Sequence, residues 1–253
     1  MTTLIITPTY NERPNIETLL ERLAAILPQA HVLVVDDNSP DGTGEYVKGR
    51  AAEEDWIHLI QRESKQGLGT AYCAGFTWAL QHNYDIVVQM DADLSHDPAQ
   101  IPGLLAYIGD YDLVLGSRYI KGVNIVNWPL SRLILSWSAN IYAKIVTGVR
   151  VADLTGGFKC WRREVLADLE IETLRSEGYA FQIETTFRAH RLGYRIKETP
   201  IVFVDRTEGD SKMSKGIILE AVWMVIRLKL GALRDGARQR SRRKDRVEED
   251  TAV

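Results

Sequence analysis

Short apolar runs alternate with longer helical patterns through the first half of the chain. The apolar runs are rich in Ile, Val and Leu, and polar, Gly or Pro residues separate them. Continuous apolar strands separated by helices are typical of a parallel sheet that helices cover on both faces. We therefore predict an α/β fold with strands over 4–7, 32–35, 57–61, 86–90 and 113–116, and with helices over about 14–26, 42–54, 67–82 and 98–108.

Polar residues follow four of these predicted strands. They occupy the segments 8–12, 36–38, 91–93 and 117–118. In an open parallel sheet, ligands bind beyond the carboxyl ends of the strands, so these segments should meet at one rim. The pattern therefore predicts a ligand site at that rim.

The segment Asp91-Ala92-Asp93 places two carboxylates one residue apart at the end of an apolar strand. Residues i and i+2 of an extended segment point to the same side, and two like charges held that close repel each other. A divalent cation relieves this repulsion. Hard oxygen ligands select Mg²⁺ or Mn²⁺, which usually keep open positions for substrate phosphates. Taken alone, the triplet is somewhat more typical of solvated acids in a turn.

Composition and charge narrow the class of protein. The chain has 253 residues, 45% of them hydrophobic, which suffices for one large α/β domain or two small ones. Its net charge of −3 gives no reason to expect a nucleic-acid partner. Cys73 and Cys160 lack metal-ligand spacing, so we expect buried thiols in a reducing compartment. We expect no signal peptide, because Met1 leads directly into the first strand, and no membrane-spanning helix, because Arg132 and Glu220 interrupt the apolar stretches.

Several motifs occur together along the chain, and together they are specific. They are PTYNE at 8–12, DDNSPDGT at 36–43, GLGTA at 67–71, DADLSH at 91–96, GSRY at 116–119, TGGF at 155–158 and GDSK at 209–212. This set resembles the family 2 glycosyltransferases with a GT-A fold, and most closely the polyprenyl-phosphate (dolichol-phosphate) mannose synthases. The resemblance runs from residue 4 to about residue 215. We expect one GT-A domain over 1–235, followed by a charged, disordered tail over 236–253.

The resemblance implies a nucleotide pocket at the ends of the first strands. Glu12 and Asp37 are expected to accept hydrogen bonds from guanine and ribose, because an ionised carboxylate only accepts and these groups donate. The family also contacts the nucleotide sugar at the positions matching Pro8, Tyr10, Val35 and Ala92. Turn and core packing are alternative roles for Pro8 and Val35. Asp36 is expected to support the loop, and 41–42 to form a turn and helix start.

The same resemblance implies the ligands of a Mg²⁺ or Mn²⁺ ion at the donor diphosphate. Asp91 and Asp93 are the first two. Ser95 is the expected third, although a hydroxyl is a weaker ligand than a carboxylate or amide oxygen. A role for Ser95 through water, or assistance from His96, stays open, but a lone histidine at this place is more often structural.

An acceptor site for a polyprenyl phosphate is implied as well. An alkyl monophosphate has a second pKa of about 6, so it is mostly ionised at neutral pH and needs no strong general base. Arg118 and Arg132 match the family's phosphate clamp, since a planar guanidinium donates two parallel hydrogen bonds. Ser136 lies one turn after Arg132 and is expected to add another. Arg206 and Lys212 match residues that contact the donor diphosphate. The plainer alternatives are a surface arginine at 132 and an ordinary surface loop at 206–212.

Two amphipathic helices are expected in the C-terminal half, at about 128–148 and 216–234. They combine Trp with Lys or Arg on largely apolar surfaces, which is typical of interfacial helices, although buried core helices are an equal alternative. The basic run 238–246 favours a membrane surface because it attracts anionic lipid. We therefore predict a peripheral protein at the cytoplasmic face of a membrane, and we leave open a membrane anchor protein as partner.

The reaction that the resemblance implies is a metal-dependent, inverting transfer of mannose from GDP-mannose to a polyprenyl phosphate, giving polyprenyl phosphate β-mannose. The resemblance assigns catalytic roles to Asp91, Asp93, Arg118 and Arg132. One alternative is a related synthase with another donor, such as UDP-glucose. A second is a noncatalytic subunit that binds lipid phosphate, which the presence of these four residues disfavours. A processive polysaccharide synthase is disfavoured because the chain has no Gln-x-x-Arg-Trp motif.

Overall fold

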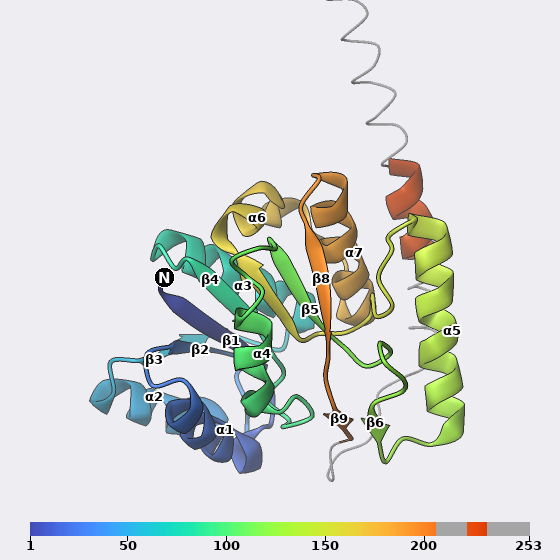
Figure 1. Ribbon diagram of the computed structural model, residues 1–253. Coiled ribbons are helices and arrows are strands. Elements are labelled where there is room, and N and C mark those ends of the chain that lie inside the picture. The colour runs from blue at the N-terminus through green and yellow to red at the C-terminus, as the bar shows by residue number, and fades with distance from the viewer. Residues whose placement is uncertain (206–221, 232–253) are drawn as a thin grey trace, which may run out of the picture.

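The sheet is mixed but mostly parallel, as the apolar runs predict (Figure 1). The computed structural model describes residues 1–205 and 222–231. Within this described part, the large sheet has the strand order β3-β2-β1-β4-β7-β5-β8, and β7 runs antiparallel to both of its neighbours. The strands are β1 (Thr3–Thr9), β2 (His31–Asp36), β3 (Ile57–Gln61), β4 (Ile86–Gln89), β5 (Leu113–Ser117), β7 (Lys159–Arg162) and β8 (Ile196–Pro200).

The register of the central strands brings their carboxyl ends to one rim. Thr9 at the end of β1 pairs with Asp36 at the end of β2, and Ile6 pairs with Gln89 at the end of β4. The five strands predicted from the apolar runs are all present, with ends that agree to within two residues. The polar segments that follow β1, β2 and β4 therefore lie beside one another.

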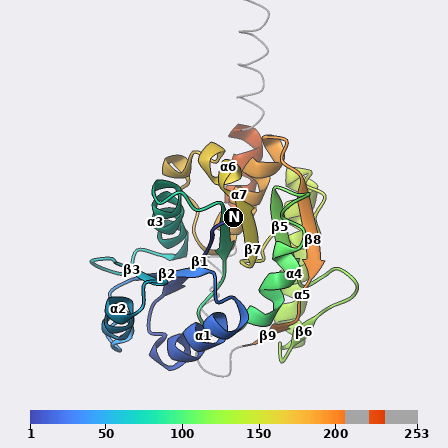
Figure 2. The same ribbon diagram turned by 60° about the vertical axis from the view of Figure 1, so that its left-hand side comes forward.

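Helices cover both faces of the sheet, because alternate side chains of a strand point to opposite faces. Ile5 and Ile16 belong to one buried cluster, and Ile6 and Phe76 belong to the other. Burying one such side chain contributes about 1.5–3 kcal/mol. In Figure 2 the sheet lies between these two layers. The helices of the first layer are α1 (Arg13–Ile26), α2 (Thr43–Glu53) and α4 (Ile101–Leu105), and those of the second are α3 (Leu68–Gln81), α6 (Arg163–Asp168) and α7 (Gly178–Arg191).

One predicted helix is shorter than expected. The segment 98–108 consists of the 3₁₀ turn η1 (Pro98–Gln100) and the short α4, which ends at Leu105. Asp97 begins the turn, since its Oδ1 accepts a hydrogen bond from the backbone N–H of Ala99 at 2.9 Å. The other three predicted helices of the first half are confirmed as α1, α2 and α3.

The helix α5 (Leu130–Thr147) stands at one side of the molecule, and residues 222–231 form a helix beside its carboxyl end (Figure 1). The two helices are joined by a hydrogen bond from the Tyr142 hydroxyl to the carbonyl of Val222, at 2.8 Å. Below them, β6 (Ile125–Val126) pairs with β9 (Phe203–Val204). The predicted helix at 128–148 is thus confirmed, as is the described part of the one at 216–234. The remainder of that helix, and the tail 236–253, lie outside the described residues.

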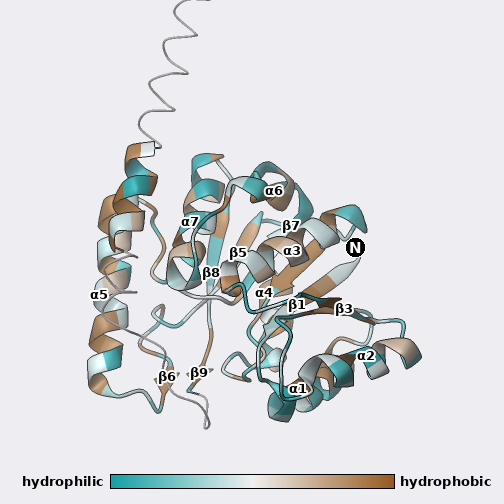
Figure 3. Cartoon of the chain, turned by 180° about the vertical axis from the view of Figure 1, so that it is seen from behind, coloured by the Kyte–Doolittle hydropathy of each residue, from teal (hydrophilic) through white to brown (hydrophobic). Residues whose placement is uncertain are grey.

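An exposed apolar stripe runs along α5. Leu130 is 70% exposed and Ile145 is 76% exposed, and Figure 3 shows hydrophobic segments alternating with more polar ones along the same helix. The stripe has helical spacing and consists of Leu130, Ile134, Trp137, Ile141 and Ile145. The helix is therefore not a buried core helix. No helix within the described residues is long and apolar enough to cross a membrane.

Candidate active site

A polar pocket of about 230 Å³ opens at the carboxyl ends of β1, β2 and β4. Its walls come from the segments after these strands and from the start of α3. It is lined by Pro8, Thr9, Tyr10, Glu12, Asp37, Lys65, Gly67, Leu68, Ala71, Asp91, Ala92 and Asp93. Of the predicted donor-site residues in the described part, the pocket brings together all except Val35 and Ser95, which are both buried.

Asp91 and Asp93 follow β4 and both face this pocket. The Tyr72 hydroxyl of α3 donates a hydrogen bond to Oδ1 of Asp91 at 3.1 Å. The Asp91 side chain keeps 35% of its surface exposed toward the pocket, while the protein packs closely around the rest of it. That burial raises the pKa of the Asp91 carboxyl above its ordinary value, and the neighbouring charge of Asp93 raises it further, against the opposing effects of His96 and Tyr72. The two carboxylates therefore fit a divalent cation, which would offset this repulsion.

A cation at this place would need oxygen atoms beyond those of the two aspartates. Among residues 1–205 and 222–231, no three His, Cys, Asp or Glu side chains converge to hold a metal. Ser95 is buried, and its backbone N–H donates to Oδ1 of Asp93 at 3.1 Å. Mg²⁺ and Mn²⁺ suit such a site, because they retain positions for water and substrate phosphates. Ser95 as a protein ligand stays a prediction.

His96 holds the backbone of the metal-site segment. Its Nδ1 accepts a hydrogen bond from the N–H of Asp91 at 3.2 Å, and its ring stacks on Phe158 with the centroids 5.0 Å apart. Burial lowers the pKa of His96, which favours the neutral imidazole that this bond requires. The structural role expected for His96 is confirmed.

The carboxylate of Asp37 is already engaged by Arg62, which follows β3. Both side chains are buried, and the Nε of Arg62 donates to Oδ1 of Asp37. Arg62 also donates to the carbonyl of Gly67 at 2.9 Å, while the N–H of Gln66 donates to Oδ2 of Asp37 at 3.1 Å. Asp37 thereby joins the loop after β2 to the start of α3. Each carboxylate oxygen accepts more than one hydrogen bond, so a ligand donor can still reach it.

The neighbouring loops are held as the motifs predict. Oδ1 of Asp36 accepts a hydrogen bond from the Thr9 hydroxyl at 2.8 Å, and Asp36 is completely buried. Asp41 accepts from the N–H of Thr43 at 3.0 Å, at the start of α2, and Gly42 takes the left-handed φ of 84° that suits glycine. Asp36 and Asp41 therefore support the loop after β2 and do not line the pocket.

Lys65 supplies a positive charge that the sequence analysis missed. Its Nζ lies 3.9 Å from the centroid of the Tyr10 ring, and both residues line the pocket. Glu12 also lines the pocket and accepts a hydrogen bond from the Asn15 side chain at 2.8 Å. Arg62 and Lys65 both lie after β3, the strand end that was left out of the predicted rim. Applying the same rule to every parallel strand would have found them.

Arg118 lies after β5 and is locked in a buried ion pair with Asp153. Its Nε and one Nη donate to the two Asp153 oxygens, each at 2.7 Å, and the same Nη donates to the Thr155 hydroxyl at 2.7 Å. Arg118 is 4% exposed and Asp153 is 0% exposed. Burial disfavours both charged forms, but the attraction and hydrogen bonds between the two side chains have the larger effect. The pKa of Asp153 therefore lies below its ordinary value, and that of Arg118 lies above it. Asp153 was not predicted, and it lies in a loop without a strand-end signal.

Arg132 is paired with Asp205 and lies over an aromatic ring. Its Nη1 donates to both oxygens of Asp205, at 3.0 and 2.8 Å. The guanidinium carbon lies 4.2 Å from the centroid of Trp128, and that of Arg118 lies 5.5 Å from the same ring. Ser136 accepts a hydrogen bond from the Tyr119 hydroxyl at 2.8 Å. The two predicted acceptor arginines thus flank one tryptophan, whereas Arg206 and Lys212 lie outside the described residues.

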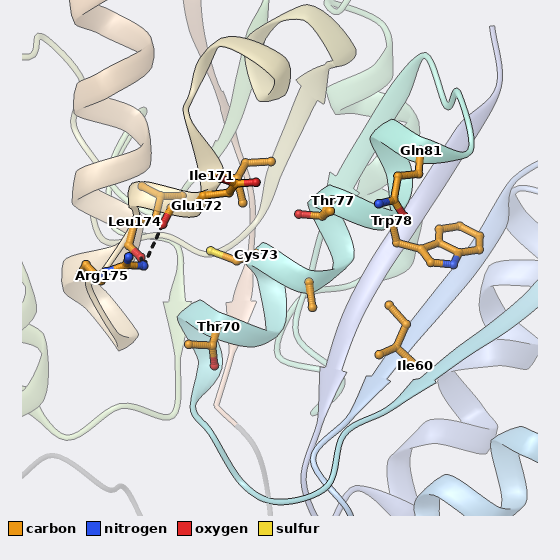
Figure 4. A pocket seen from close by; sticks show the side chains of 11 residues that line it. Ile60, Thr70, Cys73, Thr77, Trp78, Gln81, Ile171, Glu172, Leu174 and Arg175 are labelled. Atoms are coloured by element: carbon orange, nitrogen blue, oxygen red, sulfur yellow. Dashed lines mark hydrogen bonds between the residues drawn. The ribbon is translucent and has the colours of Figure 1, made fainter.

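A second cavity, of about 390 Å³, lies on the flank of α3 away from this chemistry (Figure 4). It is lined on its other side by residues of η2 (Ile171–Thr173) and by the residues after it, up to Arg175. Cys73 faces this cavity, and burial raises the pKa of its thiol to about 11. A thiol with so high a pKa is a poor nucleophile at neutral pH. We therefore take the pocket at the strand ends as the candidate active site.

Comparison with known proteins agrees with this assignment. Residues 4–170 match the family described as glycosyl transferase family 2. An undecaprenyl-phosphate mannosyltransferase of Micrococcus luteus is 48% identical over 95% of this chain and 99% of its own length. A polyprenol monophosphomannose synthase of Mycolicibacterium smegmatis is 47% identical over 88% of this chain and 85% of its own length.

The fold has solved relatives at lower sequence identity. A glucosyl-3-phosphoglycerate synthase of Mycobacterium tuberculosis, in complex with Mn²⁺, UDP and glucosyl-3-phosphoglycerate, superimposes with a TM-score of 0.64 at 19% identity. The alignment covers 91% of this chain and 79% of that one. The likeness confirms the predicted GT-A-like arrangement of a mostly parallel sheet between helices. With its family profile, its curated relatives and its fold in agreement, the chain belongs to glycosyl transferase family 2 and is a glycosyltransferase.

Proposed function

We propose that this glycosyltransferase moves mannose from GDP-mannose to the phosphate of a polyprenyl lipid. The observation that carries the proposal is the combination of two features. One is a polar pocket that ends in the carboxylates of Asp91 and Asp93, and the other is the pair Arg118 and Arg132 around Trp128. The names of the two relatives at 48% and 47% identity support mannose as the sugar and a polyprenyl phosphate as the acceptor.

The donor nucleotide would occupy the pocket at the ends of β1 and β2. Glu12 and Asp37 offer carboxylate acceptors for guanine N–H groups and ribose hydroxyls. Pro8, Tyr10 and Ala92 complete the wall, and Lys65 adds a cation near the diphosphate. Arg206 and Lys212 remain proposed contacts of the diphosphate.

Asp91 and Asp93 would hold Mg²⁺ or Mn²⁺ against the donor diphosphate, with Ser95 as a proposed third ligand. Such a cation acts as a Lewis acid and stabilises the negative charge of the departing nucleoside diphosphate. The chain's own residues prepare the place for it. His96 and Tyr72 fix the backbone and one carboxylate oxygen of Asp91, so that little reorganisation is needed when the ligands arrive.

The lipid phosphate is its own nucleophile in this proposal. One of its oxygens forms a bond to the anomeric carbon while the bond from that carbon to the diphosphate breaks, which inverts the configuration and gives a β-linked product. The phosphate is largely ionised at pH 7, so no side chain has to remove a proton. Arg132 and Ser136 would orient the phosphate, and Arg118 remains a proposed contact whose charge Asp153 already balances.

A lipid acceptor requires contact with a membrane surface, and the exposed stripe of α5 suits that contact. Its five apolar side chains lie on one helix face, and Trp137 is 53% exposed. Apolar helix faces of this kind bind at the boundary between headgroups and acyl chains. We place the protein at the cytoplasmic face, where a nucleotide sugar donor is available. A membrane anchor protein stays a prediction.

The test is an assay of purified protein with radiolabelled GDP-mannose and undecaprenyl phosphate, with Mg²⁺, Mn²⁺ or EDTA. We expect a labelled lipid that forms only with a metal, and much less product from UDP-glucose. Asp93→Asn should abolish transfer and leave the thermal unfolding temperature nearly unchanged. Transfer at the wild-type rate in EDTA, or by the Asp93→Asn protein, would refute the metal role, and preferential use of UDP-glucose would refute the donor.

A further inference from the structure

The two acceptor arginines differ in how completely their hydrogen bonds are satisfied. Arg118 uses its Nε and one Nη on Asp153 and Thr155, and it is buried with them. Arg132 instead contacts Asp205 through one nitrogen only, since Nη1 donates to both carboxylate oxygens. The pair of Arg132 and Asp205 is also more open, with side chains 21% and 18% exposed.

Two donors beside this pair are shielded from solvent and have no hydrogen-bond partner. They are the Nε of Arg132 and the indole Nε1 of Trp128, and neither has an acceptor within the described part of the chain. The guanidinium lies over the same indole, 4.2 Å from its centroid. A buried donor without an acceptor costs about 1–3 kcal/mol, so two of them on contacting side chains indicate a place for an anion with more oxygens than one carboxylate has.

The backbone on both sides of this place is fixed. The N–H of Asp205 donates to the carbonyl of Val126 at 3.1 Å, at the end of the pairing of β6 with β9. Phe203 of β9 packs edge-on against Trp128, with the ring centroids 5.5 Å apart. Asp205 can therefore leave Arg132 by rotating its side chain while the strands and the indole keep their places.

We propose that Asp205 is the resident counter-ion of the acceptor-phosphate site, and that the lipid phosphate displaces it to bind Arg132 together with the indole N–H of Trp128. This inference rests on the proposed function for the identity of the anion. A phosphate monoester brings three oxygens, which can bridge the Nε edge of Arg132 and Nε1 of Trp128, whereas the carboxylate of Asp205 reaches only Nη1 on the other side of the guanidinium. Asp205 is thus a positioning residue that sets the affinity for the acceptor, and Trp128 contacts the acceptor directly.

Arg118 takes no part in this exchange. Asp153 also accepts a hydrogen bond from the backbone N–H of Arg118 at 3.1 Å, and neither partner is open to solvent. An anion arriving from outside would have to break that buried pair, which is costly. The exchangeable arginine is therefore Arg132.

The test is calorimetric titration of the full chain with farnesyl phosphate, a short water-soluble prenyl monophosphate, without nucleotide. We expect Asp205→Asn to bind it roughly three- to fivefold more tightly than wild type, as removal of a partly exposed competing charge implies. Trp128→Phe keeps the ring over Arg132 and loses the donor, so its binding should weaken about tenfold. The matched control is Asp112→Asn, which removes a carboxylate from arginine pairs at the amino end of β5 and should leave the affinity unchanged.

A spectroscopic readout separates contact from structural support. The indole N–H resonance of Trp128, identified by its loss in Trp128→Phe, should shift when the wild-type protein is saturated with farnesyl phosphate. In transfer assays, Asp205→Asn should lower the KM for the acceptor and leave the KM for GDP-mannose unchanged. An unshifted indole resonance, or equal or weaker binding by Asp205→Asn, would overturn the inference. A wild-type protein that binds farnesyl phosphate but transfers no mannose would instead count against the proposed function alone.

Discussion

The buried pair of Arg118 and Asp153 allows a sharp stability prediction. Asp153→Asn keeps the shape of the side chain and removes its charge, which leaves the guanidinium of Arg118 buried without a counter-ion. Three hydrogen bonds from Arg118 and one from Thr155 end on this carboxylate. Breaking a buried pair by removing one partner costs about 3–5 kcal/mol, a large share of the roughly 5–15 kcal/mol that holds a domain folded.

The measurement is equilibrium unfolding in urea, followed by circular dichroism. The midpoint should fall and the slope should stay the same, since the folded shape is retained. The double variant Arg118→Met with Asp153→Leu should recover part of the loss because it removes both buried charges. A loss for Asp153→Asn below about 1 kcal/mol, which is the range of an exposed pair, would refute the reasoning.

The same pair has a defined pH dependence. The pKa of Asp153 is depressed in the folded state, so the folded protein binds fewer protons at this group than the unfolded chain. Its contribution is therefore complete above the unfolded pKa of about 3.9, and it is lost as the pH falls through the lower folded value. The difference in stability between wild type and Asp153→Asn should close in that acid range.

Three further predictions concern other parts of the molecule. The pKa of His58 is lowered by burial and by the neighbouring His31, so the contribution of this group to folding stability is complete above the unfolded pKa of about 6.5 and decreases as the pH falls below it. His58→Gln should therefore flatten the fall in melting temperature between pH 7 and 5, and an unchanged slope would contradict this. A Cβ on Gly69 would lie 2.3 Å from the carbonyl oxygen of Ser176, so Gly69→Ala should cost about 1–3 kcal/mol in urea unfolding, whereas Gly49→Ala, with open space, should not destabilise. Leu130→Ser combined with Ile145→Ser should reduce co-sedimentation with anionic vesicles, whereas Leu192→Ser, at an exposed apolar residue that ends α7, should not. Equal sedimentation of the wild type and both variants would exclude the α5 stripe as the membrane contact.

Local pattern was sufficient for most of the sheet, but not for β7 and β8. The parallel strands are continuous apolar runs, and such runs are readable because both of their faces are buried. The strand β7 is four residues long and includes two cations, Lys159 and Arg162, so its sequence does not resemble a central strand. The side chain of Lys159 is nevertheless fully buried, and its Nζ donates to the carbonyl of Gln182 and to two threonine hydroxyls. Only the tertiary structure reveals that compensation.

Residues of the candidate site could be predicted from the sequence where they follow the ends of parallel strands. Asp91, Asp93, Asp37 and Glu12 lie together because parallel strands end at one rim. Asp153 and Asp205 were not predicted, because each is defined by a partner far away in sequence. An arginine that resembles a phosphate ligand in the sequence can already have a carboxylate partner in the fold. The residues around that arginine in the sequence do not reveal the partner.

The position of β7 between β4 and β5 affects the order in which the protein can assemble. The strands β3, β2, β1 and β4 are neighbours and are complete by residue 89, but β4 remains an edge strand until Lys159 to Arg162 have been synthesised. Pairing across so long an intervening segment requires loop closure before it yields contacts, so it is slow. Until then, Asp91 and Asp93 follow a strand that is hydrogen-bonded on one side only. The arrival of β7, which also brings Gly157 close to Asp91, then joins the strands that carry the polar pocket to the strand that Arg118 follows.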